Sequence, residues 1–514
     1  MRRLVVILVL LVVALALARY LLRLPSNEGR TETHALAPDP QTALGRSLLP
    51  QGATHPGLSG IRPLWPGIEA YAARMVLARA AEQSIDARYY IWQRDSTGLA
   101  LLHELTTAAD RGVRVRLLVD DNGTPDLDAE LAALNTLPTV EVRVFNPFSL
   151  RSPRALSYPL DFPRINRRMH NKSFTVDGVA TIVGGRNIGD IYFARDTEVQ
   201  YSDFDVLATG AVVDPVARDF DAYWNSASAY PHELLVTPPS DLAALDTASA
   251  EAQADPDTAT YAQSVSDSRL VQDLLGHSLA LDWVPVTLLS DDPRKALGEA
   301  PAGTLVATAL GPLVGQARQS IDVISAYFVP GREGTERLAY AARQGLRVRI
   351  LTNSLEATDV LPVHAAYGKY RQPLLSSGVQ IFELRRTPRT EEERKALGLL
   401  GSSGASLHAK VFAIDRRAVF VGSFNFDPRS VWLNCEMGFW IESPALATTI
   451  TDALDRGAAT TWQVGLDPAG ALTWTGTDSA TPLSDEPGPT AFKRAALGPL
   501  ARPPADVRLC TPAR

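Results

Sequence analysis

Apolar residues follow two periods along this chain, and the same succession of periods occurs twice. Alternating apolar and polar positions predict strands, whereas a spacing of three to four residues predicts amphipathic helices. The segments so predicted cover residues 68–81, 84–92, 99–110, 111–120 and 140–145 in the first copy and 317–328, 344–351 and 379–384 in the second. Strands that alternate with helices favour βαβ units. We therefore expect an α/β protein of two pseudo-symmetric halves, each a mostly parallel mixed sheet flanked by helices.

The long distance between the copies indicates duplicated domains rather than a solenoid, whose repeats have about 20 to 50 residues. A stretch rich in Ala, Ser, Asp, Thr and Pro, from about residue 226 to 272, indicates a connection between them. The expected organisation is an amino-terminal segment at 1–24, a linker at 25–60, a first half at 61–225, a connection at 226–300, a second half at 301–456 and a tail at 457–514. Within the tail, residues 492–500 favour a short helix near lipid.

The amino terminus carries an uncharged apolar run from Leu4 to Ala18, with arginines on both sides. This run is short for the roughly 20 residues that span a bilayer, but Arg19 and Arg23 could keep their charges in the interface while the helix continues. The end of the run, Ala16–Ala18, could instead be the cleavage site of a signal peptide. Either alternative predicts export or membrane attachment, and the flanking arginines leave the orientation open.

Composition excludes several classes of protein. Fifty basic and fifty-seven acidic side chains give a net charge of −7, so bulk electrostatics argue against a nonspecific nucleic-acid binder. The two cysteines, Cys435 and Cys510, are too few for a disulfide framework or a cysteine-rich zinc site. An apolar content of 46% is ample for sizeable cores and excludes a disordered chain. Only six of the basic residues are lysines, which makes the position of each lysine informative.

One polar cluster occurs in each copy with identical spacing. The two clusters are His170, Lys172, Asp177, Gly184, Gly185 and Asn187, and His408, Lys410, Asp415, Gly422, Ser423 and Asn425. Residues i and i+2 of a strand point to the same face, so each histidine projects beside its lysine. An imidazole next to an ammonium can attack and hold a phosphate. An asparagine after a small-residue turn can donate to phosphate oxygens, and glycine there allows the backbone to come close.

This doubled pattern resembles the phospholipase D superfamily with its paired HKD motifs. The resemblance extends from about residue 60 to 440 and implies that both motifs meet in one active site at the interface between the halves. More narrowly, a set of motifs resembles the bacterial cardiolipin synthases of the C type: Tyr89–Trp92, Asp120–Asn122, Phe145–Phe148, Asn166–Lys172 and Gly184–Asp190. The amino-terminal apolar segment is not a requirement of the family.

The resemblance also implies covalent catalysis. One histidine attacks the phosphodiester phosphorus and the other protonates the departing alcohol, after which an acceptor alcohol attacks the phosphohistidine. The usual assignment in the family makes His170 the nucleophile and His408 the acid, although the sequence itself is symmetric. The expected catalytic residues are His170, Lys172, Asp177, His408, Lys410 and Asp415, with Asn187, Asn425, Gly185 and Ser423 binding substrate. For the two aspartates, a role in holding the turn after the strand is the simpler explanation.

The lysines and asparagines would stabilise charge on the equatorial phosphate oxygens, so neither a metal nor another cofactor is expected. A nucleophilic imidazole also needs its other nitrogen fixed as a hydrogen-bond donor. In the family a carboxylate from a later strand does this. Here Asp205 and Glu436 occupy corresponding positions, and Asp203 is the alternative in the first half.

Several neighbouring residues admit two interpretations. The aromatic run Tyr89–Trp92 could form core and cleft wall or could contact lipid. Arg167 and Arg168 could contact a lipid phosphate or form a solvated edge. The run Asp120–Asn122 lies where a parallel strand is expected to end, which suits either a site or a turn.

The function implied is that of a phosphatidyltransferase, which makes cardiolipin from phosphatidylglycerol and a donor phospholipid. It would be anchored in a bacterial inner membrane by the amino-terminal segment, with a periplasmic catalytic part as an open alternative. Phospholipids and the membrane are the expected partners, nucleic acid is not, and a helper protein is left open. The alternatives are a phospholipase D-type phosphodiesterase acting on phospholipid, less so on nucleic acid, and a membrane-tethered scaffold with an inactive site.

Overall fold

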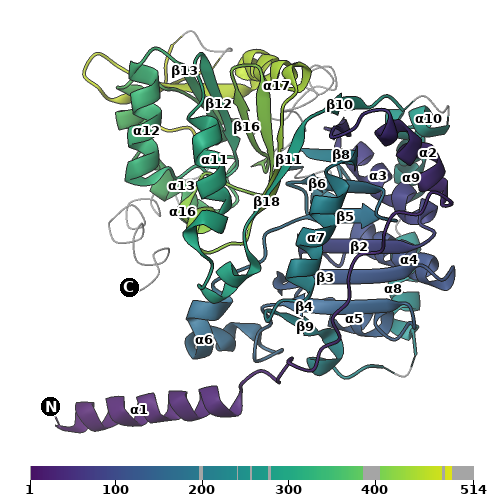
Figure 1. Cartoon of the computed structure of the whole chain (residues 1–514). Coiled ribbons are helices and arrows are strands. Elements are labelled where there is room, and N and C mark those ends of the chain that lie inside the picture. Colours follow the sequence, from purple (N-terminus) through teal and green to yellow (C-terminus); the bar gives the residue numbers. More distant parts are fainter. Residues whose placement is uncertain are drawn as a thin grey trace.

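The computed structural model describes residues 2–195, 201–239, 241–254, 258–275, 279–385, 406–476 and 481–488. Within them lie two nine-stranded sheets, one from each copy of the repeat, with helices packed against their faces (Figure 1). The α/β halves expected from the sequence are therefore confirmed. The helix expected at 492–500 lies outside the described residues.

The first sheet contains both the βαβ units and the strands around the first motif. Its strands are β1 (Ser59–Leu64), β2 (Ser84–Ile91), β3 (Arg114–Gly123), β4 (Val140–Phe145), β5 (Ser173–Val176), β6 (Ala180–Gly184), β8 (Asp205–Gly210), β9 (Ala229–Pro231) and β10 (Asp282–Val284). Their order is β10-β1-β8-β6-β5-β2-β3-β4-β9. The strands β2, β3 and β4 run parallel, with Ser84 opposite Arg114, and the described neighbours on either side pair antiparallel.

The second sheet repeats this plan. Its strands are β11 (Val286–Ser290), β12 (Ser320–Ser325), β13 (Arg347–Asn353), β14 (Gln380–Leu384), β16 (Lys410–Ile414), β17 (Ala418–Gly422), β18 (Met437–Ile441), β19 (Thr461–Leu466) and β20 (Leu472–Thr475). Their order is β11-β18-β17-β16-β12-β13-β14-β19-β20. Again three strands, β12, β13 and β14, run parallel. A short parallel pair, β7 (Tyr201–Ser202) with β15 (Ser406–Leu407), joins the two halves.

The parallel part of each sheet is smaller than the sequence patterns indicated. Helical crossovers connect β2 to β3 and β12 to β13, and such crossovers produce parallel neighbours. The strands that begin at the two motifs instead turn back after three residues, at 177–179 and 415–417, so β5–β6 and β16–β17 are antiparallel hairpins. Each sheet is thus mixed, and each motif leads into an antiparallel strand next to the parallel core.

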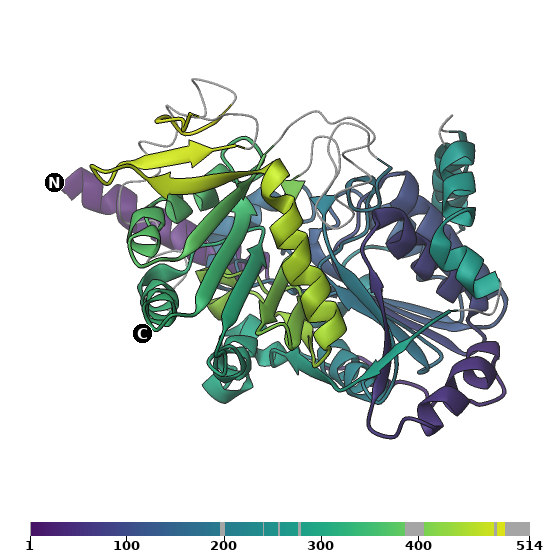
Figure 2. The ribbon, with the colours of Figure 1, turned by 90° about the horizontal axis from the view of Figure 1, so that it is seen from above.

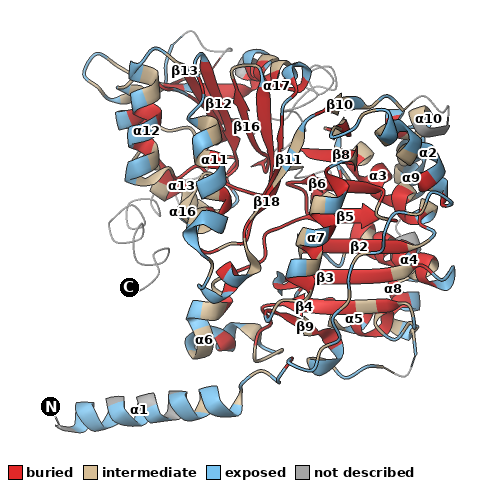
Figure 3. Ribbon diagram, viewed as in Figure 1, coloured by how far each residue is buried: buried red, intermediate tan, exposed pale blue. Residues whose placement is uncertain are grey.

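Helices cover both sheets, and the bounds of α3 and α4 follow the helical segments predicted at 68–81 and 99–110 closely, whereas the described part of the predicted connection at 226–300 contains three α-helices. In the first half they are α2 (Ala43–Ala53), α3 (Gly67–Ala80), α4 (Ser96–Asp110), α5 (Asp128–Leu134), α6 (Tyr158–Ile165), α7 (Val213–Trp224), α8 (Ala243–Ala254), α9 (Thr258–Ser266) and α10 (Arg269–Leu275). In the second half they are α11 (Val306–Val314), α12 (Gly331–Arg343), α13 (Leu361–Gly368), α14 (Arg371–Leu375), α16 (Pro428–Trp432) and α17 (Pro444–Arg456). The buried strands form the interior of both halves (Figure 3).

The two halves share a hydrophobic core. Val183 and Phe204 of the first half belong to one buried cluster with Val411, Val421 and Met437 of the second. Figure 2, seen from above, shows the two sheets side by side with this contact region between them. Burial of apolar surface between the sheets fixes the distance between the two motif strands.

The amino-terminal apolar run forms a helix, α1 (Arg2–Leu21), that extends away from the two sheets (Figure 1). Most of its described apolar side chains are exposed, including Leu4, Ile7, Leu10 and Leu17. Among the residues that the structure describes, no helix is both long and apolar enough to cross a membrane.

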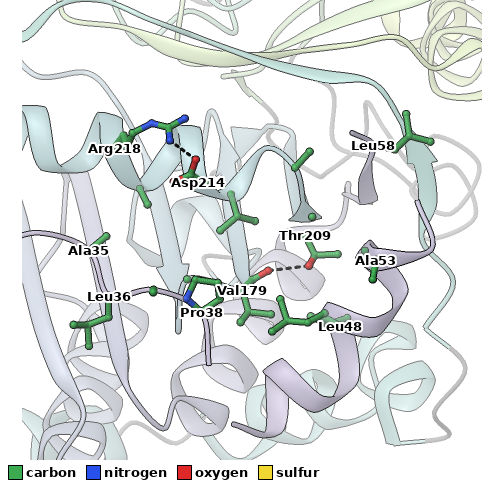
Figure 4. Close-up of a pocket in the computed structure, with 18 of the residues that line it drawn as sticks. Ala35, Leu36, Pro38, Leu48, Ala53, Leu58, Val179, Thr209, Asp214 and Arg218 are labelled. Carbon is green, nitrogen blue, oxygen red and sulfur yellow. Dashed lines mark hydrogen bonds and ion pairs between the residues drawn. The ribbon is translucent and has the colours of Figure 1, made fainter. Parts of the chain in front are cut away.

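A cavity of about 610 Å³ lies at the outer end of the first sheet (Figure 4). Leu36, Leu48, Leu58 and Val179 line it, among others. Val179 belongs to the turn between β5 and β6, whereas His170 and Lys172 lie before the opposite end of β5. The cavity is therefore separate from the site described next.

Candidate active site

Each motif is connected by backbone hydrogen bonds to the opposite half of the molecule. His170 N donates to Cys435 O at 2.8 Å, and Cys435 N donates to Arg168 O at 2.8 Å. In the same way, His408 N donates to Ser202 O at 2.8 Å, next to the β7–β15 pair. The two histidines therefore lie at the interface between the halves, as the resemblance implied.

The imidazole of His170 is oriented by a carboxylate of the second half. Its Nδ1 lies 2.8 Å from Glu436 Oε2 and 3.1 Å from Ser423 O. Both partners are acceptors, so Nδ1 carries the proton and Nε2 presents its lone pair. Since Glu436 directly precedes β18, the second sheet positions the base behind a histidine of the first.

The imidazole of His408 is oriented in the equivalent way, by Asp203 of the first half. Its Nδ1 lies 2.6 Å from Asp203 Oδ2. No described residue bonds Nε2 of either histidine. The two histidine–carboxylate pairs thus cross the interface in opposite directions, and both leave Nε2 free.

The expectation that Asp205 orients a histidine is wrong, and the alternative, Asp203, takes that place. Asp205 Oδ2 accepts from Arg74 Nη2 at 2.9 Å, and its Oδ1 accepts from Arg186 N at 3.1 Å. Residues 203 and 205 share one face of an extended chain, so alternation alone does not distinguish them. Asp205 lies two residues further along, inside the core of the first half, where Arg74 neutralises it.

Glu436 is held by several hydrogen bonds that sequence analysis did not predict. Ser423 Oγ donates to its Oε2, and Ser430 Oγ donates to its Oε1 at 2.9 Å. The backbone N of Glu436 donates to Asp291 Oδ2 at 2.7 Å, and Asp291 is paired with Lys295 at 2.7 Å. The one available signal was that Lys295 is among only six lysines.

Burial sets the protonation of the histidines. It lowers the pKa of His170 to about 4, although Glu436 opposes the shift. Burial and the Lys410 ammonium likewise lower the pKa of His408 to about 4, against Asp203. The pKa of Glu436 is below its ordinary value because His170 and Lys172 outweigh the effect of burial. Near neutral pH, both imidazoles are therefore neutral and both carboxylates ionised.

The two lysines lie beside their histidines as the spacing predicted. Lys172 Nζ donates to His170 O at 2.6 Å and lies 5.4 Å from the centre of the Tyr90 ring. Lys410 Nζ lies 3.0 Å from His408 Nδ1. Burial lowers the pKa of Lys172 to about 7 and also lowers that of Lys410. Lys410 contributes to the lowered pKa of His170, and Lys172 to that of His408, so the motifs form one electrostatic unit.

The small residues and asparagines after the motifs differ between the halves. Both ends of the Asn187 amide make hydrogen bonds within the first half. Its Oδ1 accepts from Ile91 N at 3.1 Å, and its Nδ2 donates to Tyr192 OH at 2.9 Å. By contrast, Asn425 Oδ1 is buried without a hydrogen-bond partner among the described residues. A Cβ added at Gly185 would come within 2.2 Å of Asp203 Oδ1, so glycine allows Asp203 to reach His408.

The motif aspartates do not contact the histidines. Asp177 Oδ1 accepts from Gln83 N at 2.8 Å and from Ser84 N at 2.9 Å, at the start of β2. Asp415 does the same for Gln319 N and Ser320 N, at 2.8 Å each. Both lie beyond the far end of their strand from the histidine, so the assignment of Asp177 and Asp415 as catalytic residues is corrected to a structural role.

Two further features surround the histidines. Arg168, two residues before His170, is buried and binds Asp120 through Nε and Nη2 at 2.8 and 2.6 Å. This pair anchors the segment that leads into the first motif, which excludes a solvated edge for Arg168.

Around His408, the Tyr192 and Tyr201 rings lie 5.2 and 5.0 Å from the imidazole centre. Within the described residues, no group of three or more His, Cys, Asp or Glu side chains is arranged to hold a metal ion.

Comparison with known proteins gives one consistent family. Residues 76–224 and 311–457 match the family model for "Cardiolipin synthase, PLD-like domain". The chain is 46% identical over 455 residues to cardiolipin synthase C of Escherichia coli strain K12, covering 88% of this chain and 96% of that protein. It is 31% identical over 421 residues to an uncharacterised protein of Helicobacter pylori, covering 80% of this chain and 81% of that protein.

Among solved structures, phosphatidylserine synthase of Haemophilus influenzae Rd KW20 is similar, with a TM-score of 0.52 and 16% identity. The likeness covers 82% of this chain and 91% of that one and concerns the fold alone. The family match includes both motif strands and the residues that orient both histidines. The chain belongs to the cardiolipin synthase family of proteins with a PLD-like domain.

Proposed function

We propose that this chain is a phosphatidyltransferase that makes cardiolipin from phosphatidylglycerol and a donor phospholipid through a phosphohistidine. The observation that carries the proposal is the pair of imidazoles, each held at Nδ1 by a carboxylate of the opposite half. The chain's membership of the cardiolipin synthase family supports this choice of substrates and product.

The first half of the reaction transfers the phosphatidyl group to the enzyme. Nε2 of His170 attacks the donor phosphorus, and the bond from phosphorus to the head-group oxygen breaks as His408, which enters this step as an imidazolium protonated at Nε2, gives that oxygen its proton. The bound phosphodiester anion favours this protonation of His408. The densely supported Glu436 then stabilises the positive charge on the His170 ring. Lys172 and Lys410 lie where they can balance the charge on the remaining phosphate oxygens.

The second half releases the product. The hydroxyl of phosphatidylglycerol attacks the phosphohistidine while His408 accepts its proton, and the nitrogen–phosphorus bond breaks. Asn425, whose amide oxygen has no described partner, is available to bind the incoming glycerol hydroxyl or, after rotation, the phosphate. Asn187 acts indirectly by holding Tyr192 against His408.

The test is a product analysis with the purified full-length chain and defined liposomes. Phosphatidylglycerol with different donor phospholipids should yield cardiolipin, and the His170→Asn, His408→Asn double variant should yield none. Phosphatidic acid as the sole product under every donor mixture would replace the proposal with a phosphodiesterase. Cardiolipin formation by the double variant would exclude the site altogether.

We also propose that the enzyme acts at a bacterial membrane and that α1 attaches it there, since this helix presents a run of exposed apolar side chains. Deletion of residues 2–21 should move the protein from the membrane fraction to the supernatant without abolishing turnover of a short-chain, monomeric substrate. Retention in the membrane fraction would show that α1 is dispensable for attachment. The residue bounds of the two halves, 61–225 and 301–456, stay a prediction, supported by the matched ranges.

A further inference from the structure

The segment between β4 and the first motif presents an unusual surface. It contains a short 3-10 helix, η1 (Arg154–Ser157), followed by α6, and we refer to residues 152–163 as the docking segment. Its exposed residues are Ser152, Pro153, Ala155, Leu156, Tyr158, Pro159, Phe162 and Pro163. None of them carries a charge, and the side chains of Leu156 and Phe162 are 57% and 40% exposed.

The charged residues of the docking segment are turned away from this surface and paired. Arg154 Nη2 binds Asp128 at 2.9 Å, and Asp161 Oδ2 accepts from Arg164 at 2.5 Å. An exposed apolar surface of this kind is unfavourable in water, at about 25 cal/mol per Å² of apolar area, and usually marks a binding surface. The question is therefore what covers it.

We propose that the docking segment inserts its apolar side chains into the lipid surface beside the active site. Its continuity with α1 favours lipid over another protein as the occupant. The apolar helix α1 contacts α6, and Arg19 Nη2 lies 3.7 Å from Asp161 Oδ1. Figure 1 shows both helices at the same end of the molecule, and Figure 3 shows exposed residues on both.

The charge at the base of the docking segment also suits a phospholipid surface. Arg167 is partly exposed, and within the described residues it has no carboxylate partner, since its Nη1 donates to Pro163 O. A guanidinium just behind apolar side chains can bind lipid phosphates while those side chains reach below the head groups. The pairing of Asp161 with Arg164 removes the one acidic charge that would oppose this contact.

The docking segment is linked to the catalytic histidine by a short chain of contacts. Tyr158 OH donates to Asn122 Oδ1 at 3.3 Å, and Asn122 Nδ2 donates to Tyr90 OH at 3.0 Å. The Tyr90 ring centre lies 5.0 Å from that of His170. Insertion of the segment would therefore bring the lipid surface close to His170, which the donor must reach. This placement rests on the proposed function, whereas the insertion itself does not.

The decisive experiment measures insertion without measuring catalysis. Leu156→Cys is labelled with an environment-sensitive fluorophore in a full-length Cys510→Ser background, in which the remaining Cys435 is buried. The control is Leu234→Cys, a site 41% exposed in the short 3-10 helix His232–Leu234 that follows β9. Vesicles of phosphatidylglycerol and phosphatidylethanolamine should blue-shift the label at 156 and allow its quenching by spin-labelled acyl chains, while the label at 234 stays in water.

A second measurement links insertion to turnover. The double variant Leu156→Asp, Phe162→Asp should lower the rate on vesicle phospholipid about tenfold and leave the rate on a monomeric short-chain substrate unchanged. Leu234→Asp should change neither rate. Equal spectra of the labels at 156 and 234 on vesicles would overturn the proposal. A blue shift at 156 that appears without vesicles when the protein concentration is raised would also overturn it, because it would identify a second copy of the chain as the occupant. Insertion in a protein that makes no cardiolipin would keep this proposal and overturn the proposed function.

Discussion

At the scale of single residues, Asp203 and Asp205 are two residues apart and have opposite tasks. Asp203 binds His408 Nδ1, whereas Asp205 binds Arg74 inside the first half. A carboxylate behind an imidazole fixes the tautomer and stabilises the imidazolium, so its loss affects turnover. A carboxylate paired with a buried guanidinium holds the core together, so its loss affects folding.

The substitutions Asp203→Asn and Asp205→Asn should therefore separate these effects. We expect Asp203→Asn to lower kcat by roughly 10³-fold or more with little change in stability. We expect Asp205→Asn to cost about 3 kcal/mol of unfolding free energy, because Arg74 loses its buried counter-charge. Steady-state kinetics and urea denaturation of both variants provide the check, and an inverted result would reassign the two aspartates.

Lys172 gives the reaction a pH dependence on the alkaline side. Burial lowers its pKa to about 7, so the ammonium that would balance phosphate charge is lost as the pH rises above neutrality. The rate constant kcat/KM, which reports the free enzyme, should therefore fall above about pH 7. Lys172→Arg keeps the cation and should move this alkaline limb upwards by more than one pH unit, whereas Lys369→Arg should not. If the alkaline limb of the kcat/KM profile does not move in Lys172→Arg, the limb arises from the titration of another group.

At the scale of elements, the motif aspartates hold the start of a neighbouring strand. Asp177 accepts from the backbone N of three successive residues, 82–84, and Asp415 from that of 318–320. Both residues have positive φ values, 52° and 53°, which aspartate tolerates better than most residues. The HKD pattern thus combines a chemical part and a turn that supports the strand.

Removing these two aspartate side chains should lower the stability of the fold but not the kcat of each folded molecule. Asp177→Ala should cost about 3 kcal/mol, since hydrogen bonds to an ionised acceptor contribute more than neutral ones. Asp415→Ala should cost less, because Asp415 is only half-buried whereas Asp177 is fully buried. Denaturation midpoints measure the first effect, and kcat per active site, counted by phosphohistidine burst, measures the second. A loss of kcat with unchanged stability would restore a catalytic role.

Much of the element arrangement could be predicted from periodicity. The alternation over 84–92 and the helical spacing over 99–110 correspond to β2 and α4, because local patterning decides which face is buried. The spacing from His170 to Lys172 likewise predicted that both side chains lie on one face, and both lie beside the Tyr90 ring. Periodicity does not specify contacts between the halves, so it could not identify Asp203 rather than Asp205. Asp291, which supports Glu436, lies in a loop, and its partner Lys295 lies in a short 3-10 helix, so neither residue belongs to a periodic pattern.

At the scale of the whole molecule, the interface between the halves contains two buried imidazoles whose pKa values differ between the folded and the unfolded state. In the unfolded chain each histidine has a pKa of about 6.5, whereas the folded pKa of His170 and of His408 is about 4. Between these values the unfolded state binds more protons, so folding stability rises with pH. The stability contributed by neutral burial is complete above pH 6.5 and is lost as the pH falls towards 4. Glu436, with its lowered pKa, extends the loss to lower pH with the same sign.

The magnitude of this loss can be measured on the intact protein. Urea denaturation at pH 7.5, 6.5, 5.5 and 4.5 should show the unfolding free energy falling by roughly 2 kcal/mol or more per histidine across the range. The double variant His170→Asn, His408→Asn lacks both titrating groups and should follow a clearly flatter curve. A variant with one exposed histidine replaced, His103→Asn, should keep the steep curve of the parent. Parallel curves for the parent and the double variant would mean that the pH dependence arises elsewhere and that the imidazoles are not buried in their neutral form.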